Sequence, residues 1–245
     1  MSEGTLILSV DTATTGGGVC VLRSDDVLAS IDGESALSHS NTLLRDIQAV
    51  LSDAGVSLNQ IDLFAVASGP GSFTGLRIGI ATIKALAATL NKPCLGIPTL
   101  QAIARSGGAS KSTVSLVPAG RGELFAQRFS VTAAGAVNEL DLPSHIPPAV
   151  VFKKYSELGE GVWAGIGAQV HKETILKIAS DRGPAFDESS AARHRWRVPE
   201  PVENLAIEVA RLARDRYARG EAESADQLHA LYVRPSDPEL KHAGI

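Results

Sequence analysis

The first hundred residues alternate short apolar runs with longer segments of helical periodicity. Apolar runs occupy residues 6–10, 19–22, 27–31, 63–67 and 94–97, each of a length that suits a buried strand. Between them, residues 38–54 and 74–90 carry apolar side chains at helical spacing, and Gly55 follows the first as an expected C-cap. The order is three strands and then alternating helices and strands, which predicts an α/β fold with mixed strand directions.

The pattern changes beyond residue 105. Residues 115–131 predict a strand, a turn and a strand, residues 162–167 a strand into a turn, and residues 168–179 a helix. The prolines at 143, 147 and 148 indicate irregular chain, and residues 201–218 form an amphipathic helix pattern before an extended tail. We therefore divide the chain into 1–105, 106–200 and 201–245, the last able to pack back on the first half.

The segment GPGSFTGLRIG, residues 69–79, connects a predicted strand to the helix at 74–90. It lacks the lysine and hydroxyl of a Walker loop, and its third glycine comes one residue too late for a dinucleotide fingerprint. Two interpretations remain. The glycines hold an anion at the helix N-terminus, or they permit a tight turn and close packing. The loop by itself favours close packing.

The helix that follows is apolar around most of its circumference. Only Arg77 and Lys84 are charged, and Ala81, Ala85 and Ala88 form a stripe of small residues. A helix with this composition must be buried on most sides. Either it lies in the centre of its own domain, or another chain covers its second face.

Composition excludes some classes of function and leaves one local exception. The 245 residues carry a formal net charge of −4, which gives no global reason to bind nucleic acid. Residues 193–197 read RHRWR, so Arg193, Arg195 and Arg197 are candidates for tRNA phosphate contacts and Trp196 for base stacking. The alternative, which we favour, is a solvated face with intrahelical ion pairs such as Glu208 with Arg211.

Catalytic motifs are missing from the sequence. The six histidines show no metal-ligand spacing, there is no G-x-S-x-G, and the two cysteines, Cys20 and Cys94, lie in apolar runs as expected for buried reduced thiols. Asp11 and Thr12 end the first strand, where they suit a magnesium-phosphate site or an ordinary turn. The first residues, with Glu3, predict neither a signal peptide nor a membrane span, so we expect a cytoplasmic protein.

Four stretches together resemble the TsaB (YeaZ) family: VDTATTGGGVCVL, SHSNTLL, SGPGSFTGLRIGIATIKALA and LGIPTLQAIA. The resemblance is nearly continuous over residues 5–104. Beyond them it is confined to RGELF (121–125), GIGAQ (165–169) and LYVRP (231–235). It implies an α/β, actin-like fold of two ribonuclease-H-like halves of βββαβα type, the second reduced.

The resemblance also implies a role in bacterial tRNA threonylcarbamoyladenosine synthesis. The chain would be a non-catalytic subunit that pairs with the transferase TsaD, or with itself when TsaD is absent, and works with the ATPase TsaE. It would meet tRNA through the complex, with no membrane or DNA partner. Pairing would use the helices at 38–54 and 74–90, with these candidate interface residues: His39, Leu43, Ile47, Gly71, Phe73, Thr74, Leu76, Arg77, Ile80, Ile83 and Lys84.

The same resemblance offers a composite nucleotide site. Asp11, Thr12, Gly165 and Gly167 are its candidates, with ATP or ADP and Mg bound only together with partners and no cofactor bound by the chain alone. Departures from the family pattern at Ala119, Gly120 and Ile166 remove carboxylates and weaken the case for independent ATP binding. The alternative is an actin-like ATP-dependent enzyme or a glycoprotease-type peptidase.

Overall fold

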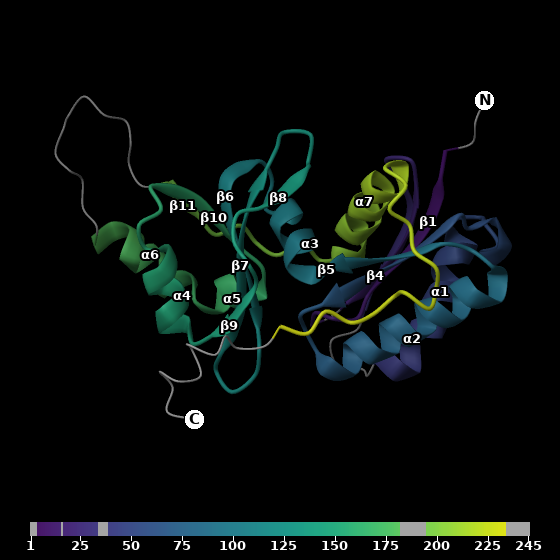
Figure 1. Ribbon diagram of the computed structural model, residues 1–245, viewed down its shortest axis with the longest axis horizontal. Coiled ribbons are helices and arrows are strands. Elements are labelled where there is room, and N and C mark those ends of the chain that lie inside the picture. Colours follow the sequence, from purple (N-terminus) through teal and green to yellow (C-terminus); the bar gives the residue numbers. More distant parts are fainter. Residues whose placement is uncertain (1–3, 16, 34–38, 182–194, 234–245) are drawn as a thin grey trace. The chain divides into compact units, whose positions relative to one another are not determined.

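The computed structural model describes residues 4–15, 17–33, 39–181 and 195–233. The chain separates into two compact units, one of Met1–Ala102 with Val202–Tyr232 and one of Ile103–Pro201 with Val233–Ile245. Figure 1 labels most of the helices and strands of both units.

The first unit is built on a five-stranded mixed sheet. Its strands, in spatial order, are β3 (Asp26–Asp32), β2 (Gly18–Arg23), β1 (Leu6–Asp11), β4 (Leu63–Gly69) and β5 (Cys94–Pro98). The pairs β1–β2 and β2–β3 are antiparallel, whereas β1–β4 and β4–β5 are parallel. The predicted mixture of strand directions is confirmed.

Helices cover both faces of this sheet (Figure 1). Leu8 and Val10 of β1 share an apolar cluster with α1 (His39–Asp53) and α2 (Phe73–Leu90). The intervening Ser9 points the other way, because side chains alternate along a strand, and its hydroxyl donates to the Ala206 carbonyl 2.7 Å away. That carbonyl belongs to α7 (Leu205–Ala218), which packs against β1, β2, β4 and β5. A short 3₁₀ turn, η1 (Leu58–Gln60), precedes β4.

The ends of two helices show how local chemistry sets their limits. Beyond α1, Gly55 adopts φ +65° and the Val56 amide donates to the Leu51 carbonyl at 3.1 Å, which confirms the predicted glycine C-cap. The α7 helix begins at Leu205, so the start predicted at residue 201 is wrong. Asn204 caps it, since its side-chain oxygen accepts from the Ala206 amide at 3.0 Å.

The second unit repeats the strand arrangement of the first, with longer central strands β6 (Ser110–Pro118) and β7 (Leu124–Val131) and short outer strands. Its strand order is β8 (Val137–Glu139), β7 (Leu124–Val131), β6 (Ser110–Pro118), β10 (Glu160–Ala164) and β11 (Arg195–Arg197), with β9 (Ser144–Ile146) paired to β7. As in the first unit, two antiparallel pairs precede two parallel pairs. The prediction of an α/β fold with two βββαβα-type halves, the second reduced, is confirmed.

Three helical segments in this region differ from expectation. Helix α3 (Thr99–Ser106) was not predicted. Helix α4 (Pro148–Tyr155) replaces the predicted irregular chain, because Pro147 and Pro148 occupy the N-cap and first helical positions, where a missing N–H costs nothing. The predicted helix at 168–179 is two helices, α5 (Ile166–Val170) and α6 (Lys172–Asp181), separated at His171.

Both cysteines behave as the sequence predicts. Cys20 and Cys94 are free and buried, and burial raises the pKa of Cys20 to about 12 and that of Cys94 to about 11, from 9.0. We expect the native protein to react with no thiol reagent at pH 8, and the guanidinium-unfolded chain to react at both thiols. Rapid modification of either thiol in the native state would contradict this burial.

The raised thiol pKa values also predict the sign of a pH effect. Above pH 9.0 the unfolded chain loses thiol protons that the folded chain keeps up to about 11. The free energy of unfolding is therefore expected to fall across this window. A Cys94→Ala variant, followed by urea unfolding at pH 8 and pH 10, should show a smaller fall than the parent chain. An equal fall would argue against the thiol as its source.

Candidate functional site

The turn after β1 is stabilised by hydrogen bonds to the carboxylate of Asp11, at the end of that strand. The Asp11 side chain is buried, and its Oδ1 accepts from the Ala13 amide at 2.8 Å and from the Thr14 amide at 3.3 Å. The Thr14 hydroxyl donates to the other carboxylate oxygen. A side chain that bonds the backbone of its own turn stabilises that turn. Asp11 is thus already engaged where a metal or phosphate ligand was considered.

Close packing explains the glycines of the 69–79 segment. The Thr12 hydroxyl donates to the Gly75 carbonyl at 2.7 Å, and a Cβ added at Gly75 would overlap the Thr12 carbonyl oxygen. At Gly71 an added Cβ would overlap the carbonyl of Ala13, and at Gly79 it would overlap the Thr12 hydroxyl. Only glycine lets the start of α2 approach the β1 turn this closely. The close-packing interpretation of the loop is confirmed.

The first turn of α2 is also hydrogen-bonded to the turn after β1. Ser72 is its N-cap, with a hydroxyl that accepts from the Gly75 amide at 3.2 Å. The Ser72 amide in turn donates to the Ala13 carbonyl at 2.8 Å. These bonds occupy the amides of Ser72 and Gly75, two of the backbone donors at the N-terminus of the helix. The position of α2 on the sheet is therefore set by its contact with the β1 turn.

The outer face of α2 is exposed although the helix is apolar. Over its 18 residues, 33% are buried within the chain, and it is the one helix in the described ranges whose length and composition would suit a membrane span. The exposed residues are Phe73, Thr74, Arg77, Ala81, Ala85, Ala88 and Thr89. The Arg77 guanidinium lies 3.8 Å from the centroid of the Phe73 ring. The small-residue stripe therefore faces outward.

The eleven candidate interface residues fall into different environments. Five lie in the core with their side chains inward, namely Leu43, Ile47, Leu76, Ile80 and Ile83. Phe73, Thr74 and Arg77 are exposed, while Gly71 and Lys84 are half-buried and His39 has a side chain outside the described set. The inward residues support the two helices and offer no contact area. The sequence missed Leu44 of α1, whose side chain is exposed.

The glycines proposed for nucleotide binding in the second unit also have a packing role. A Cβ at Gly165 would lie 2.5 Å from the Leu116 carbonyl oxygen, and one at Gly167 would lie 2.9 Å from the Leu116 Cβ. Both glycines thus let α5 pack on β6. Among the described residues there is no group of three or more histidine, cysteine or acidic side chains that could hold a metal ion. The composite nucleotide site stays a prediction about the assembled complex.

The tRNA candidates are divided between core and surface. Trp196 is only 7% exposed, its indole N–H donates to the Leu158 carbonyl at 2.9 Å, and its ring centroid lies 5.0 Å from that of Trp163. Base stacking would require it to leave this core. Arg197 is exposed. Arg193 and the side chain of Arg195 lie outside the described residues.

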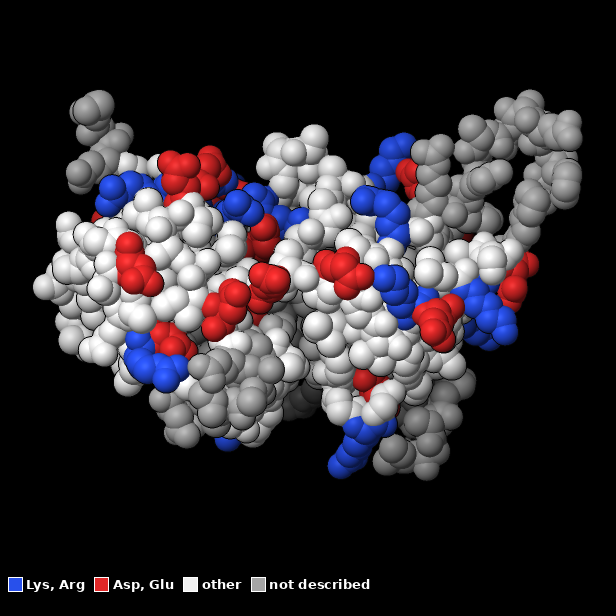
Figure 2. Space-filling model, turned by 180° about the vertical axis from the view of Figure 1, so that it is seen from behind, with Lys and Arg blue, Asp and Glu red and all other residues white. Residues whose placement is uncertain are grey.

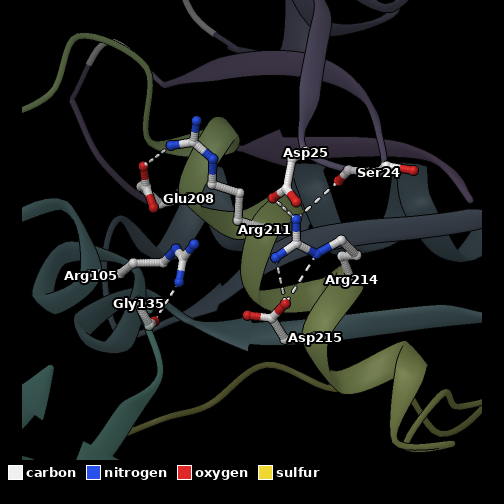
Figure 3. Close-up of polar contacts among 8 residues, drawn as sticks. All are labelled: Ser24, Asp25, Arg105, Gly135, Glu208, Arg211, Arg214 and Asp215. Carbon is white, nitrogen blue, oxygen red and sulfur yellow. Dashed lines mark hydrogen bonds and ion pairs between the residues drawn. The ribbon is translucent and has the colours of Figure 1, made fainter. Parts of the chain in front are cut away.

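Arginines of α7 are engaged in ion pairs (Figure 3). Arg211 contacts Glu208 at 2.7 Å, as predicted, and Arg214 contacts Asp215 at 2.7 Å and also Asp25. On the face seen in Figure 2, basic and acidic side chains are interspersed. Paired charges of this kind create little net field, so they do not single out a nucleic-acid surface.

Comparison with known proteins identifies the family to which this chain is related. Residues 32–142 match the family model of TsaD, tRNA N6-adenosine threonylcarbamoyltransferase. The chain is 31% identical over 168 residues to the tRNA threonylcarbamoyladenosine biosynthesis protein TsaB of Escherichia coli, covering 66% of this chain and 72% of that one. It is 26% identical to the Bacillus subtilis TsaB over 240 residues, which is 96% of both chains.

A solved structure supports the fold. YeaZ from Pseudomonas aeruginosa superimposes with a TM-score of 0.72 at 24% identity, covering 94% of this chain and 100% of that one. The two mixed sheets define an α/β protein of the actin-like class, in which a ribonuclease-H-like unit occurs twice. Within that class the chain belongs to the TsaB family, which acts in tRNA threonylcarbamoyladenosine biosynthesis.

The close approach at Gly75 predicts a stability effect. Gly75→Ala should lower the free energy of unfolding by about 2 kcal/mol or more, because the added methyl group must displace the backbone at Thr12. Gly159→Ala is the matched control, since no atom lies within 4 Å of a Cβ added there. Urea unfolding measures both variants. Equal midpoints would show that α2 tolerates displacement from the turn.

Proposed function

We propose that the chain is a non-catalytic scaffold subunit that activates threonylcarbamoyl transfer to the adenosine next to the tRNA anticodon. It would do so by pairing with the transferase TsaD through the outer faces of α1 and α2. The observation that carries the proposal is the exposed small-residue stripe of Ala81, Ala85 and Ala88 on an otherwise apolar helix. A contiguous exposed apolar face of this kind usually marks a protein interface.

The shape of the stripe favours a helix as its counterpart. Small side chains let a second helix approach toward the close end of the usual 8–10 Å range of interaxial distances. Leu44 of α1 and Phe73 of α2 add large apolar side chains beside the stripe, since both are exposed. The match of residues 32–142 to the transferase model supports a partner of related fold, so that related faces could pair.

The hydrogen bonds of the β1 turn support a subunit that catalyses no reaction itself. The Asp11 carboxylate and the Thr12 hydroxyl are both bonded within the chain. We therefore place ATP or ADP with Mg only at a site shared with partners. The ATPase TsaE would be the third component, tRNA would be held through the complex, and the chain would form a homodimer when TsaD is absent.

A reconstituted transfer assay tests the proposal. Purified TsaD, TsaE, threonylcarbamoyl-adenylate and unmodified tRNA would be incubated with the chain, without it, and with an Ala81→Arg plus Ala85→Arg variant. Both alanines are exposed, so the variant should fold. Product should require the chain and fall at least about tenfold with the variant, since two buried unpaired charges cost well over 1.4 kcal/mol.

The matched control carries the same change elsewhere. Ala133→Arg plus Ala134→Arg alters exposed alanines of the β7–β8 turn and should leave product at the parent level. Equal product from all reactions, including the one without the chain, would contradict the scaffold role. Equal product from both double variants would contradict only the assigned face.

The enzymatic alternative has its own test. The isolated chain is expected to show no ATP turnover or peptidase activity above an Asp11→Asn variant. Asn keeps one oxygen to accept from the Ala13 amide, removes the charge, and replaces the oxygen that accepts from the Thr14 hydroxyl by an amide nitrogen. Turnover that accompanies the parent chain through purification and disappears in Asp11→Asn would replace the scaffold role by an activity of the chain itself.

A further inference from the structure

After α7 the chain continues as an extended strap, residues 221–232, along the first unit (Figure 1, yellow). It begins at the edge strand β5, where the Cys94 amide donates to the Glu223 carbonyl at 2.9 Å and the Glu223 amide donates to the Cys94 carbonyl at 3.0 Å. This two-bond antiparallel bridge occupies backbone groups that an edge strand would otherwise leave unpaired. The strap is therefore anchored to the sheet at its start.

The middle of the strap is held by α2 and by the core. Leu228 is buried in the same apolar cluster as Ile80 and Ile83, and its Cδ1 would lie 3.0 Å from a Cβ at Gly96. The Lys84 ammonium donates to the Leu228 carbonyl at 3.0 Å and to the Asp226 carbonyl at 3.4 Å. Lys84, considered above as an interface residue, thus connects α2 to the strap.

The end of the strap meets the glycine-rich loop. The Leu231 amide donates to the Ser68 carbonyl at 2.7 Å, and a Cβ at Gly69 would lie 2.6 Å from the Leu231 carbonyl oxygen. The ring of Tyr232 lies 6.1 Å from that of Phe73, centroid to centroid. Two separate stretches of family resemblance therefore meet near the start of α2, since Leu231 and Tyr232, which begin LYVRP, contact the segment SGPGSFTG.

This contact produces an exposed aromatic and cationic cluster. Phe73 and Tyr232 are each 54% exposed, and Leu231 is 39% exposed. The Arg77 guanidinium lies over the Phe73 ring, 3.8 Å from its centroid. Tyrosine, phenylalanine and arginine are enriched at interface centres, and covering the exposed part of each ring would remove apolar area from water. The cluster is continuous with the alanine stripe of α2, because Phe73, Arg77 and Ala81 follow at four-residue spacing.

We infer that the strap is part of the partner-binding face, with Tyr232 as a contact residue and Lys84 as the residue that positions it. This inference rests on the proposed function and extends its interface beyond α1 and α2. The occupant is the transferase subunit, through a surface that offers an apolar socket to the two rings and a carboxylate to Arg77. Such a carboxylate would form a charge-assisted bond with the stacked guanidinium.

Affinity measurements test the contact residues. Binding of the full chain to purified transferase subunit would be measured by calorimetry for Tyr232→Ala, Phe73→Ala and the Ala81→Arg plus Ala85→Arg variant. Each aromatic truncation should weaken binding by about tenfold, a typical loss at an interface centre. Leu142→Ala is the control, because Leu142 is 79% exposed in the second unit and should leave affinity unchanged.

A double-mutant cycle tests the positioning role. Lys84→Met should weaken binding in the parent chain by about threefold to tenfold but leave affinity unchanged in a Tyr232→Ala background, because its effect passes through the strap. Lys84→Arg should retain affinity, and amide exchange at Leu231 should accelerate only in Lys84→Met. Equal effects of Lys84→Met in both backgrounds would overturn the positioning role.

The outcomes separate the two proposals. If Tyr232→Ala binds as tightly as the parent while Ala81→Arg plus Ala85→Arg abolishes binding, the strap inference fails and the proposed face on α2 stands. If neither variant changes affinity, both the face and the strap inference are wrong. If Tyr232→Ala and the double arginine variant both weaken binding and Leu142→Ala does not, the proposed face and the strap inference are both supported.

Discussion

The contact between Thr12 and Gly75 is the constraint on which the candidate site depends. The Thr12 hydroxyl bonds the Gly75 carbonyl, and its backbone oxygen occupies the space where any side chain at Gly75 would begin. This fixes the first turn of α2 against the end of β1. Since the helix is rigid, the same contact decides that Ile80 and Ile83 face the sheet and that Ala81 and Ala85 face outward.

That geometry gives the turn and glycine positions of the actin-like fold a packing role. In the first unit the carboxylate and hydroxyl at the end of β1 hold a turn and a helix. In the second unit Gly165 and Gly167 let α5 pack on β6. Polar and glycine positions that suit phosphate binding are thus engaged in packing. The prominent exposed apolar surface of the first unit is the outer face of α2 with its neighbouring strap.

Much of the first unit could be predicted from the sequence, because its strands are short uninterrupted apolar runs and its helices have clear periodicity and caps. Gly55 and Asn204 illustrate the difference that a cap makes: the first was anticipated, whereas the second shifts the start of α7 to Leu205. Helix α4 was missed because prolines usually break helices, although Pro148 occupies the one helical position that accepts them readily.

The site was harder to predict, because α2 is apolar all round and periodicity alone does not say which side meets the sheet. Leu76 and Ile80 therefore entered the candidate interface although they lie in the core, and Leu44 was overlooked. Lys84 donates to the carbonyl groups of Asp226 and Leu228, far along the chain, so no local sequence pattern predicts this contact. Trp196 likewise looked available for stacking until the fold placed Trp163 beside it.

Hydroxyl-radical footprinting of the chain, alone and with purified TsaD as the proposed partner, tests the central claim most directly, since it reports the solvent exposure of individual side chains. The account predicts that Phe73, Tyr232 and Leu44 become protected, while Leu142 and Val170, both strongly exposed in the second unit, keep their reactivity. Protection of Leu142 and Val170 with unchanged Phe73 and Tyr232 would contradict it and move the partner-binding face to the other unit.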